Sequence, residues 1–167
     1  LPQLYLPIKT LAEQRQIEAD KLVKGLGLHK MAFPDVGQDV VTFAANAALQ
    51  LLRQENLQPS AISKILVATE SGVDSSKPIG SYVISLLESQ LGARSFAHCD
   101  TVDFTFACIG GVDALQSGVD YVRLNPTEKV IVITTDNAKY DLASTGEYTQ
   151  GAGALALLIT ANPRIIA

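Results

Sequence analysis

The chain has 167 residues, of which 47% are hydrophobic, and this is enough for one domain with a sizeable packed core. A formal net charge of −4, without any cluster of Lys and Arg, argues against a nucleic-acid-binding surface. No apolar stretch approaches the roughly 20 residues that span a bilayer, and two cysteines are too few for a disulfide framework. We therefore expect a cytoplasmic protein that binds neither nucleic acid nor membranes.

The first half of the chain predicts two helices followed by a strand. Thr10 and Glu13 have the spacing of a capping box and predict a helix that runs to about Lys24. In residues 38–54, apolar side chains, many of them alanines, recur at helical spacing, which suits close packing against a sheet. The apolar run of residues 62–69 predicts a buried strand.

The second half of the chain repeats the alternation of helix and strand. It predicts helices over residues 79–91 and 112–122 and strands over residues 96–103, 130–135 and 152–160. Strands that alternate with helices of this length predict an α/β layer fold with a largely parallel sheet. No repeat or linker divides the sequence, so we expect one unit.

Cys108 is the first candidate for chemistry. It lies among small residues where a strand-like run leads into a helix, and unpaired N–H groups and the macrodipole of a helix start favour the thiolate. The same N–H groups can hold an oxyanion once an acyl thioester forms. A lone cysteine can equally be a small buried hydrophobic residue, which is our interpretation of Cys99. From spacing alone, a catalytic role, a structural role and a Cys99–Cys108 disulfide all stay open.

Glu70 is the second candidate. It follows the predicted strand of residues 62–69 and precedes a polar loop that leads into a helix. Ligands of α/β proteins gather outside the carboxyl ends of the strands, where Glu70 would meet Cys108 if their strands are near neighbours. The carboxylate could then remove a proton from an acyl methyl group. A glutamate at such a position can equally be a solvated surface charge.

Short motifs occur in one order over nearly the whole chain: Tyr5-Leu6-Pro7, Lys21 with Gly25-Leu26-Gly27, Gln38-Asp39, Ala68-Thr69-Glu70-Ser71 with Asp74 and Lys77-Pro78, Ala107-Cys108 with Gly110, Thr135-Asp136 with Tyr140, and Gly146-Glu147 leading to Thr149-Gln150-Gly151-Ala152-Gly153-Ala154. Each motif alone is weak. Together they resemble the hydroxymethylglutaryl-CoA synthase family of the thiolase-like superfamily. The resemblance implies a layered α/β fold, with a mostly parallel sheet covered by helices.

The resemblance also implies how the protein is divided. Residues 1–167 resemble the N-terminal half of the duplicated thiolase-like unit, the half that carries the nucleophilic Cys108. The family's catalytic histidine belongs to the C-terminal half, which is absent from this chain. Neither His29 nor His98 occupies a comparable position, and we interpret both as ordinary surface or packing histidines. We therefore expect this half to be inactive by itself.

The chemistry that the resemblance implies is a condensation through a covalent intermediate. An acetyl group passes from acetyl-CoA to Cys108, loses a methyl proton to Glu70 and adds to the ketone of acetoacetyl-CoA. Hydrolysis then releases 3-hydroxy-3-methylglutaryl-CoA. The reaction needs no metal or redox cofactor, and the partners are coenzyme A thioesters. The resemblance implies a role in the mevalonate pathway of isoprenoid biosynthesis. Members of the family are commonly homodimers, and the apolar strand predicted for residues 96–103 is a candidate for the dimer interface.

The resemblance further assigns residues that surround the substrates. Two acidic residues, Asp74 and Asp136, match positions that support the site. Five residues match substrate-binding positions, the first two for coenzyme A and the others for the acyl portion: Glu18, Ala19, Tyr140, Ser144 and Thr149.

Several alternatives remain beside this reading. Phe106 and Ile109 depart from the family's usual residues around the cysteine, which leaves open a polyketide β-branching synthase that acts on carrier-protein substrates. A ketoacyl synthase III relative shares the cysteine-bearing helix, but those enzymes lack a carboxylate at the position of Glu70. A non-catalytic thiolase-like interaction domain would show ordinary thiol reactivity at Cys108 and no acyl uptake.

Overall fold

The computed structural model describes residues 2–165, and its centre is a four-stranded sheet. The strand order is β4 (Asp100–Phe104), β3 (Ile62–Ala68), β5 (Lys129–Ala138) and β6 (Gly151–Ile159). β3 runs parallel to both β4 and β5, whereas β6 is antiparallel to β5. The predicted, mostly parallel sheet is therefore confirmed, with one antiparallel strand at its edge.

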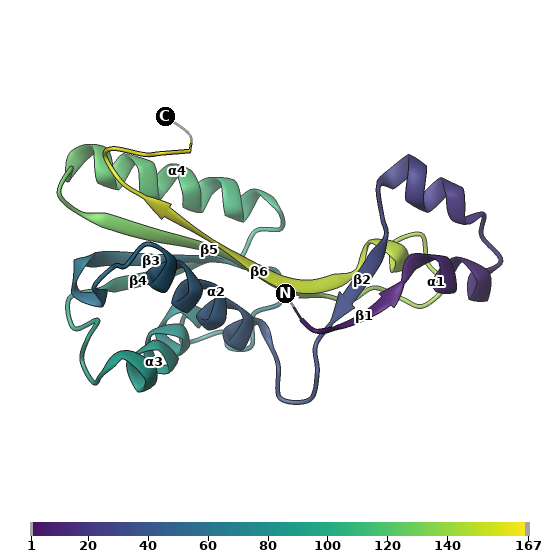
Figure 1. Cartoon of the computed structure of the whole chain (residues 1–167), viewed down its shortest axis with the longest axis horizontal. Helices are drawn as coiled ribbons and strands as arrows, with labels where there is room; N and C mark the ends of the chain where they lie inside the picture. Colours follow the sequence, from purple (N-terminus) through teal and green to yellow (C-terminus); the bar gives the residue numbers. More distant parts are fainter. Residues whose placement is uncertain (1, 166–167) are drawn as a thin grey trace.

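Helices cover both faces of this sheet (Figure 1). α2 (Val40–Gln54) and α3 (Ile79–Leu91) lie on one face, and α4 (Ile109–Leu124) lies on the other. Successive side chains of a strand point to opposite faces, so a strand between two layers must be apolar throughout. β5 meets this requirement, because Ile131 and Ile133 pack towards α2 while Val130 and Val132 pack towards α4.

Two local features set how closely the helices approach the sheet. α2 begins at a reciprocal capping box, in which Asp39 accepts the N–H of Thr42 at 2.8 Å and the Thr42 hydroxyl accepts the N–H of Asp39 at 2.8 Å. α4 carries Gly118 against β5, and a Cβ at this position would lie 3.2 Å from Cγ2 of Val132. The capping box defines the start of α2, and Gly118 lets α4 lie close to β5. Both helices form close to the predicted ranges of residues 38–54 and 112–122.

A separate arm packs beside the C-terminal end of β5 and the N-terminal end of β6 (Figure 1). It consists of β1 (Leu4–Pro7), α1 (Ile8–Arg15), the short helical turn η1 (Lys21–Gly25) and β2 (Lys30–Phe33). β1 and β2 pair antiparallel, and the arm has its own small core. β5 reaches this arm because it continues past Thr134, its last residue paired with β3, and stays paired with β6 as far as Ala138.

The predicted helix of residues 10–24 is wrong in its bounds, because two separate segments of the arm replace it. α1 starts at Ile8 without a side-chain cap and ends at Arg15, where Gln16 turns into the left-handed region with φ +55°. Its N–H returns to the carbonyls of Ala12 and Glu13 and closes the helix. Leu11 and Leu22 then pack in the same small core from two different segments and not from one continuous helix.

The predicted strand of residues 96–103 is wrong in its first part. Residues 93–98 form turns, and β4 begins only at Asp100. Phe96 is 3% exposed and packs in the main core from this turn, so burial alone made the segment look like a strand. Two short 3-10 turns, η2 (Pro59–Ala61) and η3 (Glu147–Thr149), complete the described elements. Among residues 2–165, no helix combines the length and apolarity that a membrane crossing requires.

Candidate active site

Glu70 and Cys108 lie together at the carboxyl ends of two neighbouring strands. Glu70 follows β3 and Cys108 follows β4, and these strands are paired in parallel up to Ala68 and Phe104. The thiol of Cys108 is within hydrogen-bonding distance of Glu70, with 3.5 Å between Sγ and Oε1. Both residues are exposed. A thiol and a carboxylate therefore share one accessible edge of the sheet, as expected for residues that follow neighbouring parallel strands.

Cys108 occupies the N-cap of α4 at the end of a tight connection. Ala107 before it has φ +43°, a left-handed conformation that non-glycine residues rarely adopt. A Cβ on Gly110 would lie 3.0 Å from the carbonyl oxygen of Phe104, so only glycine lets the helix start this close to β4. The N–H of Gly110 already donates to the carbonyls of Phe106 and Ala107 at 2.9 and 3.1 Å, so this N–H is not free to hold an oxyanion.

The two alternatives for Cys108 that involve burial or oxidation are contradicted. Both cysteines are free, and Cys108 is exposed. Cys99 lies just before β4 and is partly buried against the main core, which agrees with its interpretation as a small core residue but not with its placement inside a strand. Burial, with a smaller contribution from Asp100, raises the pKa of the Cys99 thiol to about 12. The Cys108 thiol is therefore accessible to solvent, whereas the Cys99 thiol is partly shielded from it.

Asp136 of β5 fastens the segment that carries Glu70. Its Oδ1 accepts three hydrogen bonds, from the Thr69 hydroxyl at 3.1 Å, the Glu70 N–H at 2.7 Å and the Ser71 hydroxyl at 2.7 Å. The Ser71 oxygen in turn accepts the N–H of Asn137 at 3.0 Å. Hydrogen bonds to a charged acceptor are stronger than neutral ones, so the position of the Glu70 backbone is set from the neighbouring strand.

The loop beyond Glu70 is shaped by a second aspartate. Asp74 accepts the N–H groups of Ser76 and Lys77 at 2.7 and 3.1 Å and the hydroxyl of Tyr82 at 2.5 Å. The bond from Tyr82, followed by those from the two N–H groups, lowers the pKa of Asp74 to about 2, and the same bond raises the pKa of Tyr82. The ammonium group of Lys77 lies 4.2 Å from the centre of the Tyr82 ring. An ionised Asp74 therefore organises this exposed loop.

The end of the same loop is held by β4. Asp103 accepts the N–H groups of Ile79 and Gly80, the first two residues of α3, at 2.5 and 3.3 Å. A carboxylate at a helix N-terminus satisfies donors that the helix itself leaves free and is favoured by the macrodipole. Sequence reasoning missed this cap, because Asp103 is far from α3 in the chain and gives no local signal.

The five predicted substrate-binding residues form two further groups. Glu18 and Ala19 lie on the arm between α1 and η1, where the exposed Glu18 pairs with Lys21 at 3.4 Å. The other three, Tyr140, Ser144 and Thr149, lie on the connection between β5 and β6. The structure thus brings Cys108 and Glu70 into contact and distributes the predicted binding residues over the arm and this loop.

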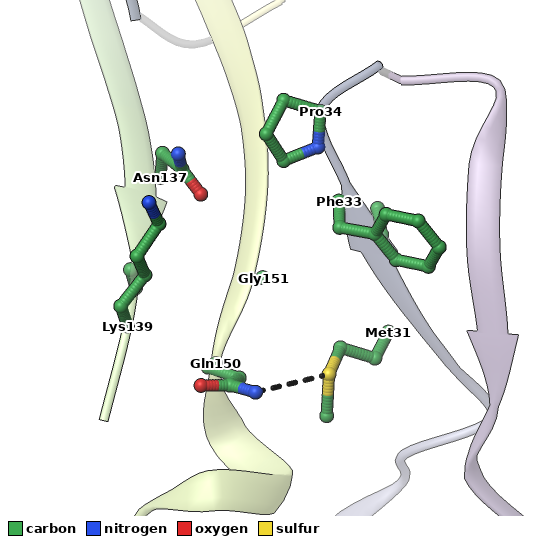
Figure 2. Close-up of a pocket in the computed structure, with 9 residues that line it drawn as sticks. Met31, Phe33, Pro34, Asn137, Lys139, Gln150 and Gly151 are labelled. Carbon is green, nitrogen blue, oxygen red and sulfur yellow. Dashed lines mark hydrogen bonds between the residues drawn. The ribbon is translucent and has the colours of Figure 1, made fainter. Parts of the chain in front are cut away.

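A cavity of about 180 Å³ opens between β2 and the start of β6 (Figure 2). Met31, Phe33 and Pro34 form its apolar side, and Asn137, Lys139 and Gln150 contribute polar groups. The Gln150 amide lies 3.6 Å from the Met31 sulfur (Figure 2). The sequence analysis did not predict this cavity, because it did not predict β2.

The two histidines agree with their interpretation as ordinary surface or packing residues. His29 and His98 are both exposed. Residues 2–165 contain no group of three or more His, Cys, Asp and Glu side chains that could hold a metal ion.

This chain is similar in sequence to part of longer proteins named hydroxymethylglutaryl-CoA synthases. The model of the family "Hydroxymethylglutaryl-coenzyme A synthase N terminal" matches residues 1–164. A hydroxymethylglutaryl-CoA synthase of Haloferax volcanii is 40% identical over 168 residues, covering 99% of this chain and 36% of the relative. One of Enterococcus faecalis is 41% identical over 167 residues, covering 100% of this chain and 42% of the relative. This chain therefore spans well under half the length of these curated relatives.

A solved structure confirms the fold. "MvaS in complex with 3-hydroxy-3-methylglutaryl coenzyme A" superimposes with a TM-score of 0.86 at 38% identity, covering 96% of this chain and 37% of that one. The predicted thiolase-like layered architecture is therefore correct. With nearly every residue matched by the family model and by relatives of 40% identity, the chain belongs to the hydroxymethylglutaryl-coenzyme A synthase N-terminal family.

Proposed function

We propose that the protein to which this chain belongs is a hydroxymethylglutaryl-CoA synthase. It condenses acetyl-CoA with acetoacetyl-CoA to give 3-hydroxy-3-methylglutaryl-CoA and free CoA, and is thus a carbon–carbon bond-forming acyltransferase. The observation that carries the proposal is the 3.5 Å approach of the Cys108 sulfur to the Glu70 carboxylate at an exposed sheet edge. The likeness to a solved structure with bound 3-hydroxy-3-methylglutaryl coenzyme A supports the choice of substrate.

The two side chains act in sequence. The Cys108 thiolate attacks the carbonyl carbon of acetyl-CoA, and the CoA thiolate leaves. Glu70 then removes a methyl proton from the acetyl thioester, and the resulting carbanion adds to the ketone of acetoacetyl-CoA. The alkoxide takes up a proton. Water finally cleaves the thioester, which forms the new carboxylate and returns the Cys108 thiol.

Orientation of the base is the contribution of Asp136. Proton abstraction requires the carboxylate to meet the methyl group at hydrogen-bonding range, and a small misplacement is costly to the rate. Asp136 accepts hydrogen bonds from the Glu70 N–H and from both flanking hydroxyls. These bonds restrict the position of the Glu70 backbone, from which its side chain extends. Asp74 restricts the loop beyond it.

The finer assignments are part of the same proposal. Glu18 and Ala19 would contact coenzyme A, and Tyr140, Ser144 and Thr149 would contact the acyl portion. Residues 1–167 would form the N-terminal half of a homodimeric, cytoplasmic enzyme of the mevalonate pathway, with a catalytic histidine in the other half. The reaction would use the two thioesters and water without a redox cofactor, because acyl transfer to a thiol, proton removal by a carboxylate and hydrolysis involve no change of oxidation state.

The decisive experiment measures acyl uptake. Full-length protein is incubated with acetyl-CoA, digested and weighed by mass spectrometry. We expect one acetyl group on the peptide that contains Cys108, and none in Cys108→Ser, whereas Cys99→Ser should acetylate normally. Ordinary thiol reactivity without acyl uptake would instead identify a non-catalytic interaction domain.

A second assay separates the acceptors. Acetylated protein receives acetoacetyl groups carried either by CoA or by an acyl carrier protein. We expect condensation on the CoA thioester. A clear preference for the carrier-bound acceptor would favour the polyketide β-branching alternative. The exposed Phe106 and Ile109, which depart from the family's usual residues near the cysteine, leave this alternative open. Release of carbon dioxide from a malonyl group would favour a ketoacyl synthase III-like reaction.

A further inference from the structure

A partly buried ion pair joins the arm to the loop between β5 and β6. Arg15, the last residue of α1, donates from Nε and Nη2 to the two carboxylate oxygens of Glu147, both at 2.7 Å. The Glu147 side chain is 4% exposed and the Arg15 side chain 31%. Glu147 also accepts the N–H of Ala143 at 2.9 Å. The pairing lowers the pKa of Glu147 and raises that of Arg15, so both groups stay charged and bonded near neutral pH.

Each partner stands directly beside one group of proposed substrate-binding residues. After Arg15 the chain turns at Gln16 and enters the segment with Glu18 and Ala19. Glu147 lies between Ser144 and Thr149, and its backbone N–H donates to the Ser144 carbonyl at 3.2 Å. Arg15 and Glu147 themselves are 132 residues apart in the chain. The ion pair is therefore a direct connection between the proposed coenzyme side and the proposed acyl side of the site.

Two weaker contacts also attach the loop to the arm: Tyr148 packs against the small core of the arm, and the Gln150 amide lies 3.6 Å from the Met31 sulfur. Across residues 139–150, all of which the structure describes, only Glu147 is buried. Leu142 is 76% exposed and Tyr140 48%. The remaining bonds of the loop are mostly internal, such as the Thr149 hydroxyl to the Gly146 carbonyl at 2.8 Å. Removing one partner of a partly buried charge pair leaves the other unsatisfied, so the spacing between the loop and the arm would depend on the weaker Tyr148 and Gln150 contacts and would be less tightly fixed.

We infer that Arg15 and Glu147 are a positioning pair that fixes the spacing between the arm and the loop for an acyl-CoA thioester. The pair acts on how the thioester binds and not on the reaction at Cys108, since neither side chain belongs to the Cys108–Glu70 contact. The inference depends on the proposed function. It adds the prediction that substrate affinity is controlled by a bond that lies between the two binding segments.

The test uses the full-length protein and steady-state kinetics with acetyl-CoA. Arg15→Met and Glu147→Gln should raise the KM for acetyl-CoA about tenfold or more while kcat stays within about twofold, which is the pattern of lost binding without lost chemistry. Arg15→Lys, which keeps the charge but not the two-pronged geometry, should fall between these variants and the natural protein. Binding of acetyl-CoA to the same variants carrying Cys108→Ser, measured by calorimetry, should weaken in parallel.

A matched control is available on the far side of the molecule. Arg164 also pairs with a glutamate, Glu55, at 2.6 Å, but this pair does not join the arm to the loop. Arg164→Met should leave the KM unchanged. The charge-swapped double variant Arg15→Glu with Glu147→Arg provides the rescue, because it restores the bond without restoring either residue; it should recover most of the lost affinity.

The outcomes separate this inference from the proposed function. If the natural protein takes up no acetyl group, the proposed function fails. If it acetylates and condenses but Arg15→Met and Glu147→Gln keep a normal KM, or lower kcat with KM unchanged, the positioning role is refuted while the enzyme assignment stands. A swapped variant that folds, as shown by its melting temperature, but binds as weakly as the single variants also refutes it.

Discussion

The N–H of Glu70 donates to Oδ1 of Asp136 at 2.7 Å, so the segment that follows β3 is tied to a side chain of β5. The same oxygen holds the hydroxyls on either side of Glu70 in the chain. The backbone of Glu70, the proposed base, is thereby attached to the sheet, and this fixes the point from which its side chain extends.

Glu70→Gln should separate the two halves of the reaction. The amide keeps the shape of the side chain but cannot accept a methyl proton, so condensation should fall by about 100- to 10,000-fold. Acetylation of Cys108 should remain within about tenfold of normal, because that step needs no base at this position. Stopped-flow or quench measurements of acetyl-enzyme and product provide both rates. Glu13→Gln, a change on the exposed surface of α1, is the control, and normal condensation by Glu70→Gln would remove Glu70 as the base.

Asp136→Ala should damage both stability and condensation. The Thr69 hydroxyl, in a residue that is 2% exposed, and the Glu70 N–H lose their shared acceptor. Unsatisfied groups of this kind cost about 1–3 kcal/mol, which chemical denaturation can measure. Ser71→Ala removes only one of the three bonds and should show a smaller loss on both counts. An Asp136→Ala variant that condenses at the normal rate would show that the base needs no support from β5.

Gly80→Ala should be among the most damaging small changes outside the site. A Cβ at this position would lie 1.7 Å from Oγ1 of Thr101, which itself donates to the Ile65 carbonyl at 2.7 Å. Relief requires α3 to move from β4, and such overpacking costs about 1–3 kcal/mol or more. Gly25→Ala is the matched control, because a Cβ there meets nothing within 4 Å. Equal melting temperatures for the two variants would contradict the close contact.

The two cysteines should differ sharply in their reaction with thiol reagents. Burial raises the pKa of Cys99 to about 12, so this thiol stays protonated and unreactive at neutral pH, and its reactive fraction grows about tenfold per pH unit below that value. Cys108 is exposed. Iodoacetamide at pH 7.5 should therefore label Cys108 alone, as read by mass spectrometry of the native protein. Cys99→Ser should not change the labelling, whereas rapid modification of Cys99 without denaturant would disprove its protected position.

The central sheet could be predicted because its pattern is local. Runs such as residues 130–135 are apolar on both faces, which only a strand between two helical layers requires. The contact between Glu70 and Cys108 followed from this architecture, since residues after neighbouring parallel strands emerge at the same edge. Sequence reasoning thus located the centre of the site through the topology and not through any direct signal between the two residues.

The arm could not be predicted in the same way. Its helix ends at Gln16, which adopts a left-handed conformation although neither glycine nor proline marks the turn. β1 and β2 have four residues each and pair across a long stretch of intervening chain. The Arg15–Glu147 pair and the Asp136 bonds join distant segments. Such contacts depend on the finished fold, and no short window of sequence contains both partners.

The loop between β3 and α3 is anchored at each end by a carboxylate from a different strand, Asp136 at Glu70 and Asp103 at Ile79. Its two terminal amide protons should consequently exchange with deuterium slowly, although the loop lies at the surface, while the amides between them exchange fast. Heating or mild denaturant would then release this segment only when β4 or β5 separates from it. Local opening near the base would be coupled to the cooperative unfolding of the whole sheet.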